Sequence, residues 1–200
     1  SALMQGLADG YFVLPYTIQN YLSDEIHVER MTTELPEFEK AEREITQKID
    51  KLMNIKGKRS VDSIHKELGK IMWDKVGMAR TKESLTEAVD QINELKKEFW
   101  ENLRIPGEKN NMNAELEKAL RLSDFLELGE LMARDAKIRE ESCGGHFRKE
   151  YQTKEGEALR NDKDFSYVSA WEFNGENTEP ILLKEALNYE YIEVKQRNYK

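Results

Sequence analysis

One short stretch, residues 139–148, gathers the residue types that could do chemistry. It reads Arg-Glu-Glu-Ser-Cys-Gly-Gly-His-Phe-Arg and holds the single cysteine of the chain and one of its three histidines. Cys143 and His146 could form a thiolate–imidazole pair or half of a zinc site. A zinc site usually needs four ligands, and a cysteine nucleophile needs a base, an orienting group and a pocket. We therefore predict no metal ligand and no catalytic residue here.

The same stretch fits a corner of the fold better. The Gly144-Gly145 pair permits positive φ, so the chain can reverse where a long helix ends. Such a turn makes a charged corner that is suited to docking a partner. The residues that we expect around it are Arg139, Glu141, Ser142, His146 and Arg148.

The other histidines offer no second site. His65 lies within a helical pattern, and His27 has charged neighbours and no partner at metal-ligand spacing. The chain also contains no G-x-G-x-x-G, P-loop, nucleophile elbow or H-E-x-x-H motif. These absences leave the residues around Cys143 as the one constellation to be explained.

Composition excludes several classes of protein. The 200 residues are 38% apolar and 35% charged, with a net charge of −8, so a general nucleic-acid surface is not expected. A single cysteine rules out an internal disulfide framework and suits a reducing compartment. The longest uncharged stretch, Gly10–Ser23, is shorter than the roughly 20 residues that span a bilayer.

Four stretches carry apolar residues at the three- and four-residue steps of an amphipathic helix. Pro36 suits a first helical turn, Gly57 a helix stop, and Ser60, Thr81 and Asn113 suit N-caps. The expected core positions, helix by helix, are Phe38, Ala41, Ile45, Ile49 and Leu52; Ile64, Leu68, Met72 and Val76; Leu85, Ala88, Ile92, Leu95 and Phe99; and Leu116, Leu120, Phe125, Leu128, Leu131, Met132 and Ile138.

Short links between these helices predict a mainly α fold, an up-and-down, spectrin-repeat-like bundle of three to four long helices. After residue 145 the pattern ends. We expect an irregular C-terminal strap with short strands at 165–173 and 191–195, where β-branched and aromatic residues gather. Residues 1–22 differ from the rest, with one charge and apolar residues on nearly every side. Such a helix is normally buried against other protein.

Two parts of the chain resemble motifs of a known family. The pattern Ala133-x-x-Ala136-x-x-Arg139-x-Glu141-Ser142-x-Gly144-x-His146-x-Arg148 resembles A-x-x-R-x-E-S-R-G-A-H-x-R-x-D-[FY] in the flavoprotein subunits of succinate dehydrogenase and fumarate reductase. The opening residues 1–5, with Gly10, resemble the end of the family's N-R-L-G-x-N-S-L-x-[DE] motif. Residues 164–167 and 196–199 resemble its H-T-L-x-Y and I-R-x-Y segments.

The resemblance implies a parent enzyme that interconverts succinate and fumarate by hydride transfer with FAD. It passes electrons through an iron–sulfur subunit to a membrane cytochrome b or quinone anchor. The family's catalytic residues lie upstream of Ser1, so we expect this chain alone to be an inactive scaffold that binds no flavin. The expected location is the cytoplasmic side of a bacterial inner membrane, held there by the partner subunits, with the chain itself soluble.

The resemblance also implies three regions. Residues 1–23 would end the flavin-binding domain, 24–145 would form the helical bundle, and 146–200 would be the C-terminal extension. In the parent, Ala2 and Leu3 would contact FAD through their backbone, because the family's serine is replaced by Ala2.

Two further residues depart from the family pattern. Cys143 stands where the family has arginine, and Glu150 stands where it has aspartate. A free-standing helical-bundle interaction module is the alternative, since many scaffold proteins share charged, heptad-like helices. Such a module should begin with a capped, polar helix, which residues 1–22 are not.

Overall fold

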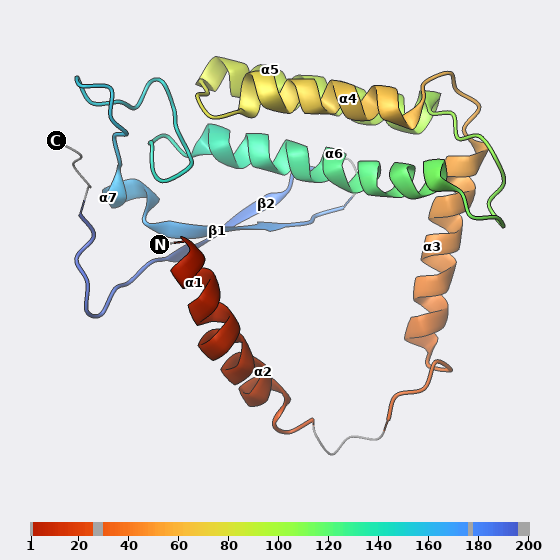
Figure 1. Cartoon of the computed structure of the whole chain (residues 1–200), viewed down its shortest axis with the longest axis horizontal. Coiled ribbons are helices and arrows are strands. Elements are labelled where there is room, and N and C mark those ends of the chain that lie inside the picture. Colours follow the sequence, from red (N-terminus) through yellow and green to blue (C-terminus); the bar gives the residue numbers. More distant parts are fainter. Residues whose placement is uncertain (1, 26–29, 176–177, 196–200) are drawn as a thin grey trace. The chain divides into compact units, whose positions relative to one another are not determined.

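The computed structural model describes residues 2–25, 30–175 and 178–195. It is mainly helical, as the sequence predicts, with one small antiparallel sheet near the C-terminus (Figure 1). The chain divides into two compact units, residues 1–46 and 47–200. Among the described residues, no helix combines the length and the apolar character needed to cross a membrane.

The N-terminal unit begins with a nearly uncharged helix. It comprises α1 (Ala2–Ala8), a π-helical segment η1 (Asp9–Val13) and α2 (Leu14–Leu22). None of the residues in these three segments is buried. Phe12 and Tyr16, for example, are 65% and 64% exposed. The segment is helical in the structure, and its apolar side chains remain in contact with solvent.

Helix α3 (Pro36–Asn54) begins at the proline expected to open it, and it extends from the first unit into the second. Phe38 and Ile45 are exposed, so their prediction as bundle core residues is wrong. Only the end of α3 reaches the core, through Leu52 with Ile49 beside it. The earlier turns offer a narrow apolar stripe between charged residues, which buries too little area to hold a helix.

Three helices form the bundle of the second unit. They are α4 (Val61–Ile71), which continues as the π-helical segment η2 (Met72–Val76), α5 (Lys82–Asn102) and α6 (Ala114–Ile138). The three N-caps predicted from sequence are confirmed. Their side chains accept backbone N–H bonds from Ser63 to Ser60 at 3.2 Å, from Ser84 to Thr81 at 3.0 Å and from Leu116 to Asn113 at 3.1 Å.

The core follows the predicted stripes of α4 and α5 but not that of α6. Leu85, Ala88, Ile92, Leu95 and Phe99 are all buried, as expected. On α6, by contrast, the residues predicted for the core that the structure leaves exposed are Phe125, Leu128, Met132 and Ile138. The buried positions of that helix are Leu116, Ala119, Leu122, Ser123, Leu126, Gly129, Glu130, Ala133 and Ala136.

Small residues explain which face of α6 is buried. A Cβ added at Gly129 would lie 3.3 Å from Met72 Sδ and 3.5 Å from Leu68 Cδ1, so α4 and η2 pack directly against the glycine. A helix that contacts two neighbours needs short side chains where the backbones approach. The prediction that the face of α6 with the largest hydrophobic side chains forms the core is therefore wrong.

Gly57 has a different role from the helix stop that was predicted. α3 ends at Asn54, and the chain after it runs along the end of α5, with Gly57 N–H donating to the Leu103 carbonyl at 3.1 Å. A Cβ on Gly57 would lie 1.9 Å from the Asn102 carbonyl oxygen. Gly57 therefore allows two backbones to approach, which is a reason for glycine that helix patterns do not indicate.

The strap contains a short helix, α7 (Asp162–Phe165), and a hairpin of β1 (Tyr167–Glu172) and β2 (Ile181–Ala186). In its register Tyr167 lies opposite Ala186, and Glu172 opposite Ile181. The first strand was predicted, but the strand predicted at 191–195 is wrong, because the described residues there form none. Residues 181–186 lie closer along the chain to β1, so less loop entropy is lost when they pair with it.

Candidate docking corner at the end of helix α6

An arginine from the strap closes the end of α6. Arg148 is 1% exposed, and its Nη1 donates to the carbonyl oxygens of Ala136 and Lys137 at 3.1 and 3.2 Å. The last carbonyls of a helix have no partner within the helix. A cation beside them also interacts favourably with the negative end of the helix dipole. Arg148 therefore caps α6 by both hydrogen bonding and charge.

Glu150 joins this cap to the beginning of α5. Its carboxylate accepts hydrogen bonds from Arg148 Nε at 3.2 Å and Nη2 at 3.4 Å, and from the Lys82 backbone N–H at 2.5 Å. Burial by itself would raise the pKa of Glu150, but the bonds from Arg148 and the Lys82 N–H outweigh it and lower that pKa. One carboxylate thus connects the C-terminal end of one bundle helix with the N-terminal end of another.

A tight turn brings Arg148 back to the helix end. Cys143 and His146 exchange backbone hydrogen bonds of 2.9 and 3.0 Å, and Gly144 lies between them at a φ of +58°. Ser142, which is fully buried, accepts the Arg148 N–H at 2.8 Å and donates to the Arg148 carbonyl at 3.2 Å. The glycine pair thus allows the chain reversal that the sequence predicts, and the two hydrogen bonds of Ser142 stabilise it.

Arg139 and Glu141 attach the rest of the strap. Glu141 is 2% exposed and accepts from Arg139 Nη1 at 3.0 Å and from the Asn161 N–H at 2.9 Å. Arg139 also donates to the carbonyl oxygens of Phe165 at 3.2 Å and Tyr167 at 3.1 Å. The structure therefore brings all five predicted corner residues together, and the polar groups of Glu141, Ser142 and Arg148 bond within the chain.

His146 is half-buried and surrounded by cations. Its Nε2 lies 2.8 Å from the Arg139 carbonyl oxygen, which can only accept, so Nε2 carries the proton of this bond. Burial lowers the pKa of His146, and the charges of Arg80, Arg148 and Arg139 lower it further against the opposing bond to the Arg139 carbonyl. The neutral imidazole is therefore the form that the corner accommodates.

Sequence reasoning missed Arg80, which pairs with the corner through its backbone. Its N–H donates to the Phe147 carbonyl at 3.2 Å, and its carbonyl accepts the Lys149 N–H at 2.9 Å. Nothing in the sequence marks Arg80, because it lies in the short link between η2 and α5, far along the chain from Arg148. The family pattern could have pointed to Glu150, since its counterpart there is an aspartate.

The other candidate residues do not assemble into a chemical site. His65 is an exposed residue of α4 whose ring lies 5.6 Å from that of Phe125, and His27 lies outside the described residues. Within the described part of the chain, no three His, Cys, Asp or Glu side chains gather as a metal site would require. Ala2 and Leu3 lie exposed on α1.

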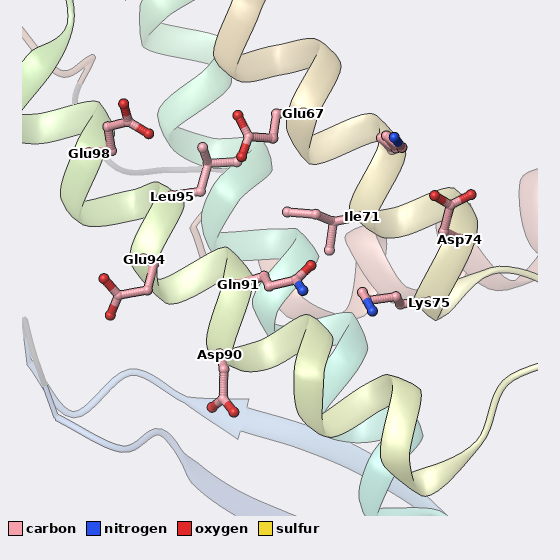
Figure 2. Close-up of a pocket in the computed structure, with 10 residues that line it drawn as sticks. Glu67, Ile71, Asp74, Lys75, Asp90, Gln91, Glu94, Leu95 and Glu98 are labelled. Atoms are coloured by element: carbon pink, nitrogen blue, oxygen red, sulfur yellow. The ribbon is translucent and has the colours of Figure 1, made fainter.

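A groove of about 720 Å³ lies between α4–η2 and α5, with Ile71 and Leu95 among its lining residues. Figure 2 shows how these side chains lie. Arg59 binds Glu67 at 2.9 Å and Glu98 at 2.8 Å, and so connects the two sides of the groove. The bond to Glu67 contributes most to the raised pKa of Arg59. Glu67 and Glu98 thus link α4 to α5 through Arg59.

Comparison with known proteins identifies a family from the sequence. Residues 65–199 match the family described as fumarate reductase flavoprotein C-term. The fumarate reductase flavoprotein subunit of Proteus vulgaris is 33% identical over 123 residues, which are 62% of this chain and 20% of that protein. The 8-methylmenaquinol:fumarate reductase flavoprotein subunit of Wolinella succinogenes is 33% identical over 89 residues, 44% of this chain and 14% of that protein.

Solved structures agree at the level of fold. A quinol-fumarate reductase structure with menaquinol molecules matches with a TM-score of 0.69 at 24% identity, covering 84% of this chain and 28% of that one. The chain spans about a fifth of the length of the curated relatives that it matches. The family match begins at residue 65, so it does not include the N-terminal motif resemblance.

Proposed function

Since this chain belongs to the family of fumarate reductase and succinate dehydrogenase flavoproteins through their C-terminal domain, we propose that it is the helical scaffold of such a subunit. The parent enzyme would interconvert succinate and fumarate by hydride transfer with FAD. The observation that carries this proposal is the family match over residues 65–199, in a chain that covers only 20% of the Proteus vulgaris subunit. That match does not favour the alternative of a free-standing interaction module.

The residues present do not form a flavin site by themselves. Residues 1–22 contain no basic side chain and no glycine-rich phosphate loop. Only backbone groups at the start of α1, at Ala2 and Leu3, could face a flavin that other parts of the parent hold. We propose this arrangement for residues 1–23, with 24–145 as the bundle domain and 146–200 as the C-terminal extension.

The corner residues would act by position. Arg148 and Glu150 hold the ends of α6 and α5, while Arg139 and Glu141 hold the strap, so the bundle presents a fixed surface. The partners we propose are the iron–sulfur subunit and a membrane cytochrome b or quinone anchor. The support is that relatives are named as quinol-linked fumarate reductases. A place on the cytoplasmic side of a bacterial inner membrane, through those subunits, follows from the same proposal.

The test compares this chain with a longer chain that contains it. Both are purified and measured for visible flavin absorbance and for fumarate reduction by reduced viologen. We expect the longer chain to be yellow and active and the 200-residue chain to be colourless and inactive. A colourless longer chain would contradict the flavoprotein assignment, and activity of the short chain would contradict the scaffold role.

An assembly experiment tests the docking role separately. The longer chain is co-expressed with its iron–sulfur subunit, either unchanged or with Arg139→Met, and the complex is isolated through a tag on the iron–sulfur subunit. Loss of co-purification, with bound flavin retained, is the expected result. Unchanged co-purification would show that the corner is not needed for docking. Arg43→Met, on the exposed part of α3, is the matched control.

A further inference from the structure

Arg80 carries a positive charge that no ion pair within the described residues neutralises. Its Nε is buried without a hydrogen-bond partner, and its one side-chain bond is a long contact of 3.4 Å from Nη2 to the Gly145 carbonyl. Among the described residues no carboxylate lies within ion-pair distance of it. Arg80 is half-buried, and a partly buried charge without an ion-pair partner is unfavourable. We therefore expect Arg80 to lower the stability of this chain.

The surroundings of Arg80 add to this cost. Burial lowers its pKa, and the charge of Arg148 lowers it further. Arg80 also lies just before the N-terminus of α5, where the helix dipole favours anions rather than cations. All three effects disfavour a guanidinium at this point.

The carboxylates of Asp135 and Glu150 already have hydrogen-bond partners. Asp135 interacts with Arg80 only at longer range, and it accepts a hydrogen bond from Trp171 Nε1 at 3.1 Å. Glu150 is bound by Arg148 and by the Lys82 N–H. An anion that neutralises Arg80 must therefore come from outside the described chain.

There is room for such an anion beside the turn. A Cβ added at Gly144 or at Gly145 would meet nothing within 4 Å, and both residues are exposed. Nη1 of Arg80 makes no hydrogen bond within the described chain and leaves one edge of the guanidinium open. A planar guanidinium edge matches a carboxylate in geometry and charge.

We propose that Arg80 and the Gly144-Gly145 turn form a docking point for a protein surface that presents an aspartate or glutamate side chain. This deepens the proposed docking role of the corner and rests on it. The incoming carboxylate would pair with the open edge of Arg80 and relieve its repulsion with Arg148. The small turn would let the partner's backbone approach closely.

The first test is the sign of a stability change in this chain, which needs no flavin or partner. Arg80→Met should raise the melting temperature by about 2–4 °C, because it removes an uncompensated charge. Arg80→Lys, which keeps the charge, should not raise it. Arg43→Met, at an exposed arginine paired with Glu39 at 3.5 Å, is the matched control and should change little. A lower melting temperature for Arg80→Met would overturn the proposal, since Arg80 would then be a stabilising residue.

The second test uses acetylated tetraglutamate amide as the probe, with sodium sulfate as a comparison at constant ionic strength. Tetraglutamate should raise the melting temperature of the unchanged chain and of Arg43→Met but not that of Arg80→Met. If sulfate alone gives the increase, the site holds an adventitious ion only and the protein-docking proposal fails. An equal response from Arg80→Met would likewise overturn it. Because these measurements use this chain alone, their failure is distinct from a failure of the flavoprotein assignment.

Discussion

Helix α6 and the α1–α2 segment are both rich in apolar residues, yet α6 buries part of its surface and α1–α2 stays exposed. α6 buries nine of its 25 residues, including alanines and a glycine, whereas α1 and α2 bury none. Phe99 on α5 is fully buried, while Phe12 before α2 is 65% exposed. Apolar content alone therefore does not decide what becomes core.

The two regions differ in whether a neighbouring helix offers a complementary packing surface. α6 has small residues where α4 and η2 approach, and its last carbonyls are bound by Arg148. By contrast, no residue of α1 or α2 is buried. A large exposed apolar surface usually marks a contact with another protein. The exposed apolar residues of α1–α2 therefore support the proposal that another part of the parent protein covers this segment.

The largest loss of stability is expected when the bundle loses its buried cation, Arg148. Arg148→Met should lower the free energy of unfolding by about 3–5 kcal/mol, because the carbonyls of Ala136 and Lys137 lose their buried donor and Glu150 loses its ion-pair partner. Urea unfolding followed by circular dichroism measures the change. The exposed pair of Arg43 with Glu39 is the control, and Arg43→Met should cost less than about 0.5 kcal/mol. Similar values for the two variants would contradict the capping role.

The close approach at Gly129 gives the next largest effect. Gly129→Leu should cost about 1–3 kcal/mol, because the added side chain must displace Met72 and Leu68. Gly69→Ala is the matched control, since nothing lies within 4 Å of its Cβ position and alanine favours a helix by about 1 kcal/mol. The two substitutions should therefore change stability with opposite signs in the same urea measurement. A stabilising Gly129→Leu would mean that α4 and α6 are not tightly packed there.

Local signals were sufficient for much of the fold. Ser60, Thr81 and Asn113 act as the N-caps that their types indicated, and the α5 stripe forms the core without exception. Capping and one-sided helix faces are properties of neighbouring residues, so sequence records them. The buried face of α6 depends on two other helices, and its large Phe125 gave the wrong signal.

The corner was predictable only in part. The turn at Gly144 and the grouping of Arg139 with Arg148 follow from short spacings and from the family motif. Arg80 enters from a distant link through backbone pairing, which no side-chain pattern marks. The absence of an ion-pair partner for its guanidinium among the described residues depends on the folded surroundings, so the sequence does not predict it.

A smaller effect is expected on how stability depends on pH, where His146 of the corner is compared with the exposed His65 of the bundle. Because the pKa of His146 is lowered in the folded state, the unfolded chain binds more protons as pH falls below about 6.5. Stability should therefore decrease from pH 7 toward pH 5.5, above the range in which carboxylates titrate. His146→Gln should reduce this slope in thermal unfolding at constant ionic strength. His65→Gln, at an exposed position, should leave it unchanged, and equal slopes for His146→Gln and the unchanged chain would remove His146 as its source.

The smallest effect is expected where the apolar surface is open. Phe12→Ala should change the free energy of unfolding by no more than about 0.5 kcal/mol, because an exposed side chain gains little from folding. The chemically identical Phe99→Ala should cost about 3–5 kcal/mol, since that ring is buried in the bundle. Binding of the dye ANS should fall in Phe12→Ala, as an exposed aromatic surface is removed. If Phe12→Ala instead destabilises the chain as much as Phe99→Ala, the α1–α2 segment has a cover within this chain and does not await another protein.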